Sequence, residues 1–137
     1  MGLFDFLKSS KKEEVKSIVN SIGKFTFIEF DGTKNYKGLI DSKINDAIEV
    51  LFPVKENEIS DYQTEYYKKI ESNWNLISNQ LKEKNPQINI ENFKITNILI
   101  PDKNHQYYDM DAEIVLQNKS NIISIILKDL TVDEVIY

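Results

Sequence analysis

The sequence predicts an α+β fold, with a mostly antiparallel sheet of about six strands, in the order α-βββ-α-βββ, packed against one long amphipathic helix. Three observations carry this prediction. Residues 58–84 repeat apolar side chains at the spacing of one helix face. The segments before and after them have the alternation and composition of strands. Turns of hairpin length separate those segments, and such turns favour antiparallel pairing.

Residues 1–22 are predicted as an N-terminal amphipathic helical segment, and residues 23–137 as a single α+β domain. The apolar residues before Gly23 recur at steps of three or four, and glycine is a typical helix end. These residues are Val15, Ile18, Val19 and Ile22. A chain of 137 residues fits one domain, because single cores are typically built from about 100–150 residues.

Three strands are predicted in the first half of the domain. Residues 24–30 are rich in aromatic and β-branched side chains, and Asp31-Gly32 after them is typical of a tight turn. Residues 36–41 are the expected hairpin partner. Residues 45–54 alternate well and are predicted as the third strand.

The long helix is predicted from one apolar stripe over residues 58–84. Ser60 with Gln63 three residues later resembles a capping box at its start, and Asn85-Pro86 ends it. We interpret the aromatic residues of the stripe as core. The stripe consists of Ile59, Tyr62, Tyr66, Ile70, Trp74, Ile77 and Leu81.

Three further strands are predicted at residues 93–100, 107–117 and 122–128. Residues 122–128 are apolar on both faces, so we expect this strand to be central and covered on both sides. Residues 130–137 either extend it or form a separate short strand.

The composition excludes several kinds of site. The chain has no cysteine, which excludes disulfides, thiolate zinc sites and cysteine nucleophiles. All 17 basic residues are lysine and the net charge is −5, which argues against a nucleic-acid partner. We predict no cofactor or metal, because no phosphate-binding glycine loop or metal-ligand spacing occurs. No secretory signal and no apolar run of about 20 residues is visible, so we expect a cytoplasmic protein.

His105 is the single histidine, and we expect it to be a solvent-exposed loop residue. A general base needs a group that orients it, and zinc needs three or four ligands. No second histidine or cysteine is present to supply them. The sequence therefore indicates no catalytic residue.

Asp109, Asp111 and Glu113 alternate along the predicted strand 107–117, so we expect them to project from one face. They are either the solvated outer face of an ordinary strand or an acidic patch for a basic protein partner. A divalent-cation site and a carboxylate pair of the glycosidase type also stay open. We take these three residues as the candidate protein-binding surface.

The opening hairpin resembles that of small, uncharacterised bacterial α+β domains of the polymorphic-toxin immunity-protein type. The resemblance rests on residues 23–27, 31–33 and 36–41, and on the order of the later helix and closing strands. It covers most of residues 23–137. It implies a stoichiometric protein-binding role, and it carries no functional residue over to this chain.

The sequence thus predicts a non-enzymatic, cytoplasmic protein-binding domain, and the resemblance implies an immunity protein that neutralises a basic toxin. The alternative is an accessory protein docked on a membrane or a larger complex through residues 1–16, whose acidic residues make the membrane the less favoured partner. A third hypothesis is an enzyme that uses carboxylates and tyrosines. A deep pocket lined by two or more of Asp109, Asp111, Glu113 and Tyr107 would indicate it. A homodimer could form through an edge strand near residues 24–30 or 130–137.

Overall fold

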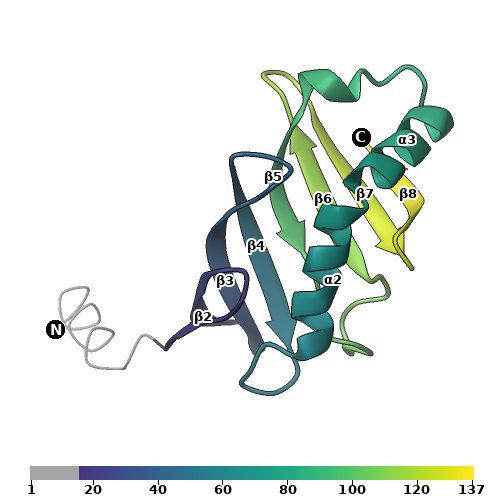
Figure 1. Ribbon diagram of the computed structural model, residues 1–137. Helices are drawn as coiled ribbons and strands as arrows, with labels where there is room; N and C mark the ends of the chain where they lie inside the picture. Colours follow the sequence, from purple (N-terminus) through teal and green to yellow (C-terminus); the bar gives the residue numbers. More distant parts are fainter. Residues whose placement is uncertain (1–15) are drawn as a thin grey trace, which may run out of the picture.

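The computed structural model describes residues 16–137, which form one eight-stranded sheet with helices on one side (Figure 1). The strands lie side by side in chain order, from one edge of the sheet to the other. All neighbours pair antiparallel except the fourth and fifth strands, which are parallel. The strands are β1 (Ser17–Val19), β2 (Lys24–Phe30), β3 (Thr33–Asp41), β4 (Ala47–Val54), β5 (Lys94–Leu99), β6 (Ala112–Gln117), β7 (Ile122–Lys128) and β8 (Thr131–Ile136).

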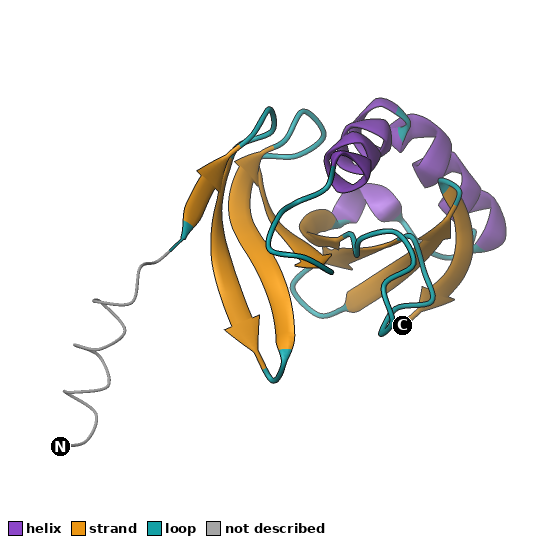
Figure 2. Ribbon diagram, turned by 90° about the horizontal axis from the view of Figure 1, so that it is seen from below, coloured by secondary structure: helices purple, strands orange, loops and turns teal. Residues whose placement is uncertain are grey.

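The parallel pair β4–β5 requires a long connection, because the chain must return to the same end of the sheet before it runs in the same direction again. This connection consists of α2 (Asp61–Ser72), α3 (Trp74–Lys84) and the short 3-10 helix η1 (Ile90–Asn92). Figure 2 shows that α2 and α3 cover the same side of the sheet. The two antiparallel meanders, β1 to β4 and β5 to β8, therefore share one helical layer.

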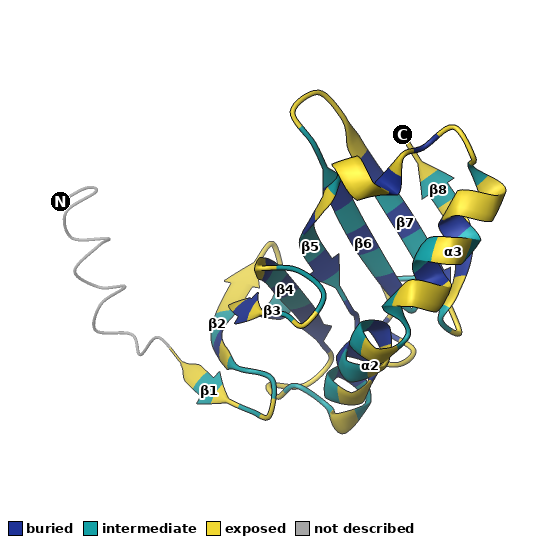
Figure 3. Cartoon of the chain, turned by 45° about the horizontal axis from the view of Figure 1, so that its top comes forward, coloured by how far each residue is buried: buried dark blue, intermediate teal, exposed yellow. Residues whose placement is uncertain are grey.

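The core lies between the helices and the sheet face that they cover. Figure 3 shows buried and less buried residues alternating along β6 and β7. The fully buried side chains of the layer include Ile48, Val50 and Phe52 of β4, Ile114 of β6, and Ile70, Ile77 and Leu81 of the helices. Burial of one such side chain typically stabilises the fold by about 1.5–3 kcal/mol.

The predicted single long helix is wrong, because residues 61–84 form two helices separated at Asn73. The Ser72 hydroxyl donates to the Lys68 carbonyl (3.0 Å) and the Asn73 side-chain amide donates to the Lys69 carbonyl (2.8 Å). Side chains that bond to the preceding turn in this way compete with the helical ladder. The capping box is confirmed, since the Gln63 backbone N–H donates to the Ser60 hydroxyl and the Ser60 N–H donates to the Gln63 side chain.

The predicted number of six strands and the order α-βββ-α-βββ are also wrong. Residues 17–19, which we expected in a helix, form β1 and pair with β2. The Asn20 side-chain oxygen accepts from the N–H groups of Ile22 and Gly23 at 2.9 and 3.2 Å, and this turn reverses the chain. The β-branched Ile18 and Val19 also suit a strand. The remainder of the predicted N-terminal segment, residues 1–15, lies outside the described residues.

The closing strands differ from the prediction in the start of the strand expected at residues 107–117, since β6 begins at Ala112, and in the place of β7 in the sheet. Residues 131–136 form the separate strand β8, so β7 lies next to the edge rather than in the centre of the sheet. Ile122 of β7 is 59 % exposed, and the expectation that both faces of this strand are covered is wrong. Isoleucine favours strands in general, so a run of isoleucine does not reveal whether one face or both faces of the strand are covered.

Side chains of α3 form hydrogen bonds to the backbone of the edge strand β8. The Val132 N–H donates to the Gln80 side-chain oxygen at 2.8 Å, and the Lys84 ammonium donates to the Val132 carbonyl. Two side chains thus occupy backbone groups that a foreign strand would need for pairing. Of the two expected edges, β8 is an edge strand, whereas β1 covers residues 24–26 of β2 and leaves residues 28–30 without a partner strand on that side within residues 16–137. Across residues 16–137, no helix is both long enough and apolar enough to span a bilayer.

We predict that Gly38→Ala destabilises the protein by about 2–3 kcal/mol, because β2 and β3 approach too closely to admit a side chain. A Cβ at Gly38 would lie 2.5 Å from the Lys24 carbonyl oxygen and 2.9 Å from Cδ2 of Phe25. Urea unfolding measures the loss.

The matched control for this experiment is Gly32→Asn. Gly32 has φ +80° in the β2–β3 turn and no atom within 4 Å of its added Cβ, and asparagine tolerates this conformation. We expect a change below about 1 kcal/mol. Equal effects of the two substitutions would contradict the close-packing explanation.

Candidate functional site

A hollow of about 410 Å³ lies beside α2, between that helix, the loop 101–111 and the β7–β8 turn. We call it the acidic hollow. Figure 1 shows the loop beneath the N-terminal end of α2. The residues that line it include three tyrosines and three aspartates: Tyr62, Tyr66, Tyr108, Asp102, Asp111 and Asp129.

The helical wall of the hollow is anchored through the first turn of α2. The Gln63 side chain is completely buried, and its Nε2 donates to the carbonyls of Pro53 (2.8 Å) and Ile100 (3.0 Å), at the ends of β4 and β5. The Ser60 hydroxyl donates to Oδ1 of Asp102 at 2.8 Å. The loop after β5 is therefore tied to the start of the helix, and Asp102 has a defined position in the wall.

The β7–β8 turn supplies the wall opposite the loop. Asp129 and Leu130 both have positive φ, 52° and 61°, which costs a residue such as leucine about 1–2 kcal/mol. Two hydrogen bonds hold the turn in place. The Asp129 N–H donates to Oδ2 of Asp111 (2.7 Å), and the Leu130 N–H donates to the Tyr66 hydroxyl (3.0 Å). A strained turn kept by contacts on both sides is typical of a functional region.

The electrostatic environment of the hollow is negative. Burial raises the pKa of Tyr62, and the charges of Asp111, Asp129 and Asp102 raise it further. Within residues 16–137, the ion pairs shorter than 4.0 Å are Lys37–Glu49, Lys68–Glu65 and Lys82–Glu91, and none involves a carboxylate of the hollow. Lys69 and Lys103 also line the hollow, but neither lies within 4.0 Å of one of its three carboxylates.

His105 lies in the predicted loop, but the expectation that it is exposed is wrong. Its side chain is 8 % exposed, and it lines the acidic hollow. Its Nδ1 accepts from the Tyr107 N–H at 3.2 Å, and its ring lies 5.1 Å from that of Tyr108. The loop folds around the imidazole, and loop position alone did not reveal this burial.

The structure divides the predicted acidic surface. Residues 107–111 are a loop, and β6 begins at Ala112, so Asp109, Asp111 and Glu113 do not share one strand face. Asp111 lines the hollow, Asp109 is exposed in the loop, and Glu113 lies half-buried on β6. The sequence analysis missed Asp102, at the start of the same loop as Asp111, and Asp129, in the β7–β8 turn. Nothing in the sequence around these two aspartates indicated that they would lie close to Asp111.

The hollow does not have the lining that would favour the enzyme hypothesis. Of the four residues whose convergence would indicate it, only Asp111 lines the hollow. In the part of the chain that the structure describes, no cluster of three or more histidine, aspartate or glutamate side chains has the geometry to hold a metal ion.

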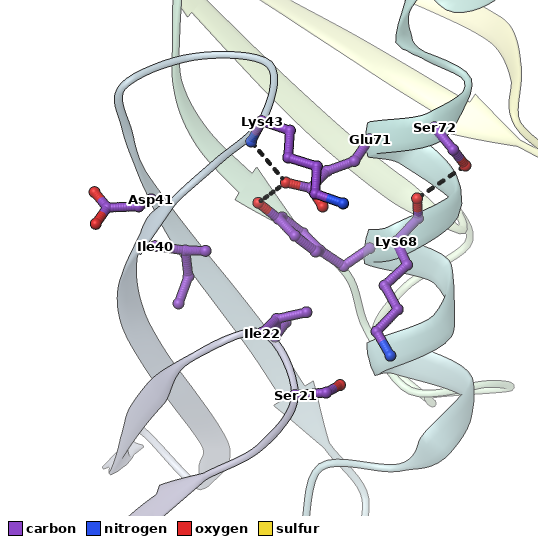
Figure 4. Close-up of a pocket in the computed structure, with 9 residues that line it drawn as sticks. Ser21, Ile22, Ile40, Asp41, Lys43, Lys68, Glu71 and Ser72 are labelled. Carbon is purple, nitrogen blue, oxygen red and sulfur yellow. Dashed lines mark hydrogen bonds between the residues drawn. The ribbon is translucent and has the colours of Figure 1, made fainter.

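A second hollow of about 440 Å³ lies between the β1–β2 turn and α2 (Figure 4). Of its two carboxylates, Asp41 and Glu71, the second is engaged in hydrogen bonds within the fold. One oxygen of Glu71 accepts from the Ser42 hydroxyl (3.1 Å), the Lys43 N–H (3.0 Å) and the Tyr67 hydroxyl (3.1 Å). Glu71 thus fastens the β3–β4 loop to α2, and its role is structural.

Comparison with known proteins adds no relative. No family model matches the chain, and no curated protein or solved structure matches it either. The resemblance to immunity-type domains therefore stays a prediction.

We predict that Tyr66→Phe destabilises the protein by about 1–2 kcal/mol, because the Leu130 N–H loses its acceptor in a strained turn. Chemical denaturation measures the change. The control is Tyr62→Phe on the same wall, whose hydroxyl has no hydrogen-bond partner among residues 16–137, and we expect less than about 0.5 kcal/mol. Equal losses in both variants would be inconsistent with a role of the Tyr66 hydroxyl in holding the turn.

We predict that stability falls as the pH rises above about 10. Burial is the main cause of a raised pKa in several tyrosines, and it raises that of Tyr67 to about 12. The native state then keeps protons that the unfolded chain releases, so this stability is complete below about pH 10 and declines toward about pH 12. The group comprises Tyr36, Tyr62, Tyr66, Tyr67 and Tyr108.

Urea unfolding between about pH 8 and about pH 11.5 tests this prediction. Tyr67→Phe should reduce the decline by at most about 1.4 kcal/mol per pH unit, the contribution of one proton. Tyr107→Phe is the control, because this side chain is 64 % exposed, and it should leave the decline unchanged. An identical decline in wild type and Tyr67→Phe would refute the assignment.

Proposed function

We propose that the chain is a non-enzymatic, cytoplasmic protein-binding domain that binds a basic protein through the acidic hollow. The observation that carries the proposal is the convergence of Asp102, Asp111 and Asp129 without an ion pair within residues 16–137. Among protein-binding roles we propose that of an immunity protein, which neutralises a toxin by stoichiometric binding.

The charge arrangement supports a cationic partner. Like charges held close together repel, so a positive side chain from a partner would relieve an unfavourable interaction. The net charge of −5 acts over a longer range, because it accelerates the approach of a basic protein. Asp109 and Glu113 stand on either side of Asp111 in sequence, and we assign them to the periphery of the contact.

The surroundings of the hollow also suit a protein interface. Its walls are tied together before any partner binds, through Ser60 with Asp102 and through Asp111 with Asp129. Little conformational entropy is then lost on binding. Tyr107 in the same loop is 64 % exposed, and exposed tyrosines are common in the energetic centres of interfaces.

We predict that the triple variant D102N/D111N/D129N binds the basic partner about tenfold or more weakly than wild type. Asparagine retains an acceptor oxygen for the bonds from Ser60 and Asp129, so the walls should persist. The partner is captured on the immobilised chain from its native host, purified, and titrated at about 50 and about 500 mM salt. The triple variant should also show a flatter salt dependence.

The control variant is E29Q/E83Q/E134Q, which removes the same charge from exposed positions on β2, α3 and β8. It should retain most of the affinity. The variant D109N/E113Q tests the periphery and should have an intermediate effect. A captured protein that binds wild type and the triple variant equally well contradicts the proposal.

The immunity role has its own test. Co-expression of the wild-type chain should relieve growth inhibition caused by the captured protein, and the triple variant should not. A captured protein that does not inhibit growth would leave the binding proposal standing and remove the immunity role.

A further inference from the structure

We infer that the acidic hollow is a pocket for one arginine side chain of the partner. This inference rests on the proposed function and names the group that the partner inserts. Four features carry it: the aromatic wall, the free carboxylate oxygens, the buried imidazole and the composition of the chain itself.

The aromatic wall matches a flat cation. Tyr62 and Tyr66 stand one helical turn apart on α2, and their ring centroids lie 5.9 Å from each other. Tyr108 lines the hollow from the loop. A guanidinium group stacks on aromatic faces and is weakly hydrated, so it can pack against these tyrosines at low desolvation cost.

The carboxylates still have acceptor positions to offer. Oδ1 of Asp102 accepts from Ser60 and from the Lys103 N–H, and Oδ2 of Asp111 accepts from the Asp129 N–H. The other oxygen of Asp102, the other oxygen of Asp111 and both oxygens of Asp129 have no donor among residues 16–137. A guanidinium carries five N–H donors in a rigid fork, which suits several acceptors around one point.

His105 also lacks one hydrogen-bond partner. It is more than nine-tenths buried, and it lines both the acidic hollow and a hollow of about 370 Å³ beside the β2–β3 turn. Its Nδ1 accepts a hydrogen bond from the Tyr107 N–H, so the neutral ring carries its proton on Nε2. That N–H has no acceptor in the described part of the chain. A buried donor of this kind requires an acceptor, and a backbone carbonyl beside the bound arginine would supply one.

The chain's own residues do not fill this role. All of its basic residues are lysine, so it contains no guanidinium. Lys69 and Lys103 line the hollow, yet neither forms an ion pair with its carboxylates. An ammonium is a compact and strongly hydrated charge that would satisfy few of the dispersed oxygens. The volume of about 410 Å³ lies within the range of preformed ligand pockets.

The test uses N-acetyl-L-arginine N-methylamide as the probe, titrated into the full chain and followed by amide chemical shifts. We expect saturable shifts at residues 62–66, 102–111 and 129–130, with a dissociation constant of about a millimolar. The lysine equivalent should bind about fivefold more weakly, and the citrulline equivalent, which has the same shape without the charge, about tenfold more weakly.

Two variants test the geometry. The Asp129 carboxylate accepts no hydrogen bond within residues 16–137, and the residue sits at φ 52°, a conformation that asparagine tolerates. Asp129→Asn should therefore keep the turn and weaken the probe about fivefold. Tyr62→Leu should weaken it by a similar factor through loss of the aromatic face. Glu134→Gln on β8 is the charge-matched control for Asp129→Asn and should bind the probe as wild type does.

The outcomes separate this inference from the proposed function. Equal binding of the arginine and citrulline probes, equal binding of the lysine probe, or an unchanged affinity in Asp129→Asn would overturn the arginine pocket. If a basic protein still binds in a manner that depends on the three aspartates, the proposed function survives that failure. If the arginine probe binds selectively and no basic protein depends on the aspartates, the pocket stands and the proposed function falls.

Discussion

Gln63 joins the start of α2 to the ends of the two parallel strands. Its buried Nε2 donates to the carbonyls of Pro53 and Ile100, while its Oε1 accepts from the Ser60 N–H at 3.0 Å. A buried amide is tolerated only when its hydrogen bonds are made, because each lost bond leaves a desolvated polar group. The position of α2 along the sheet and the closure of β4 against β5 are therefore set by the same side chain.

The parallel pair needs this support because it is a short seam between two meanders. Its register covers three residue pairs, from Glu49 with Asn97 to Leu51 with Leu99, and two further bonds extend it, from the Ile100 N–H to the Leu51 carbonyl and from the Asp102 N–H to the Pro53 carbonyl. The helices strengthen the seam, since they bury side chains of both meanders in one layer. The chain after β5 then leaves the sheet at a defined point.

The acidic hollow forms next to the place where the chain leaves the sheet after β5. The loop that leaves β5 brings Asp102 and Asp111 beneath α2, and the β7–β8 turn, fastened by Tyr66, brings Asp129 to the same place. Gathering like charges without an ion pair to them lowers stability, as does the left-handed Leu130. Proteins commonly give up stability in this way where they recognise another molecule.

The sequence by itself determined the features that act within a single turn of chain: the Asp31-Gly32 hairpin, the Ser60–Gln63 capping box and the helix end before Pro86. It also determined the charge and the lack of arginine, and it indicated one residue of the hollow, Asp111.

Tertiary structure decided the rest. The apolar stripe of residues 59–81 runs through the break at Asn73 because periodicity records which side chains face the core and not where the backbone leaves the helix. Ile18 fits a helix face or a strand, and only pairing with β2 selected the strand. Asp102 and Asp129 meet Asp111 because the β5–β6 loop and the β7–β8 turn lie at the same end of an antiparallel meander, and no local pattern records that contact.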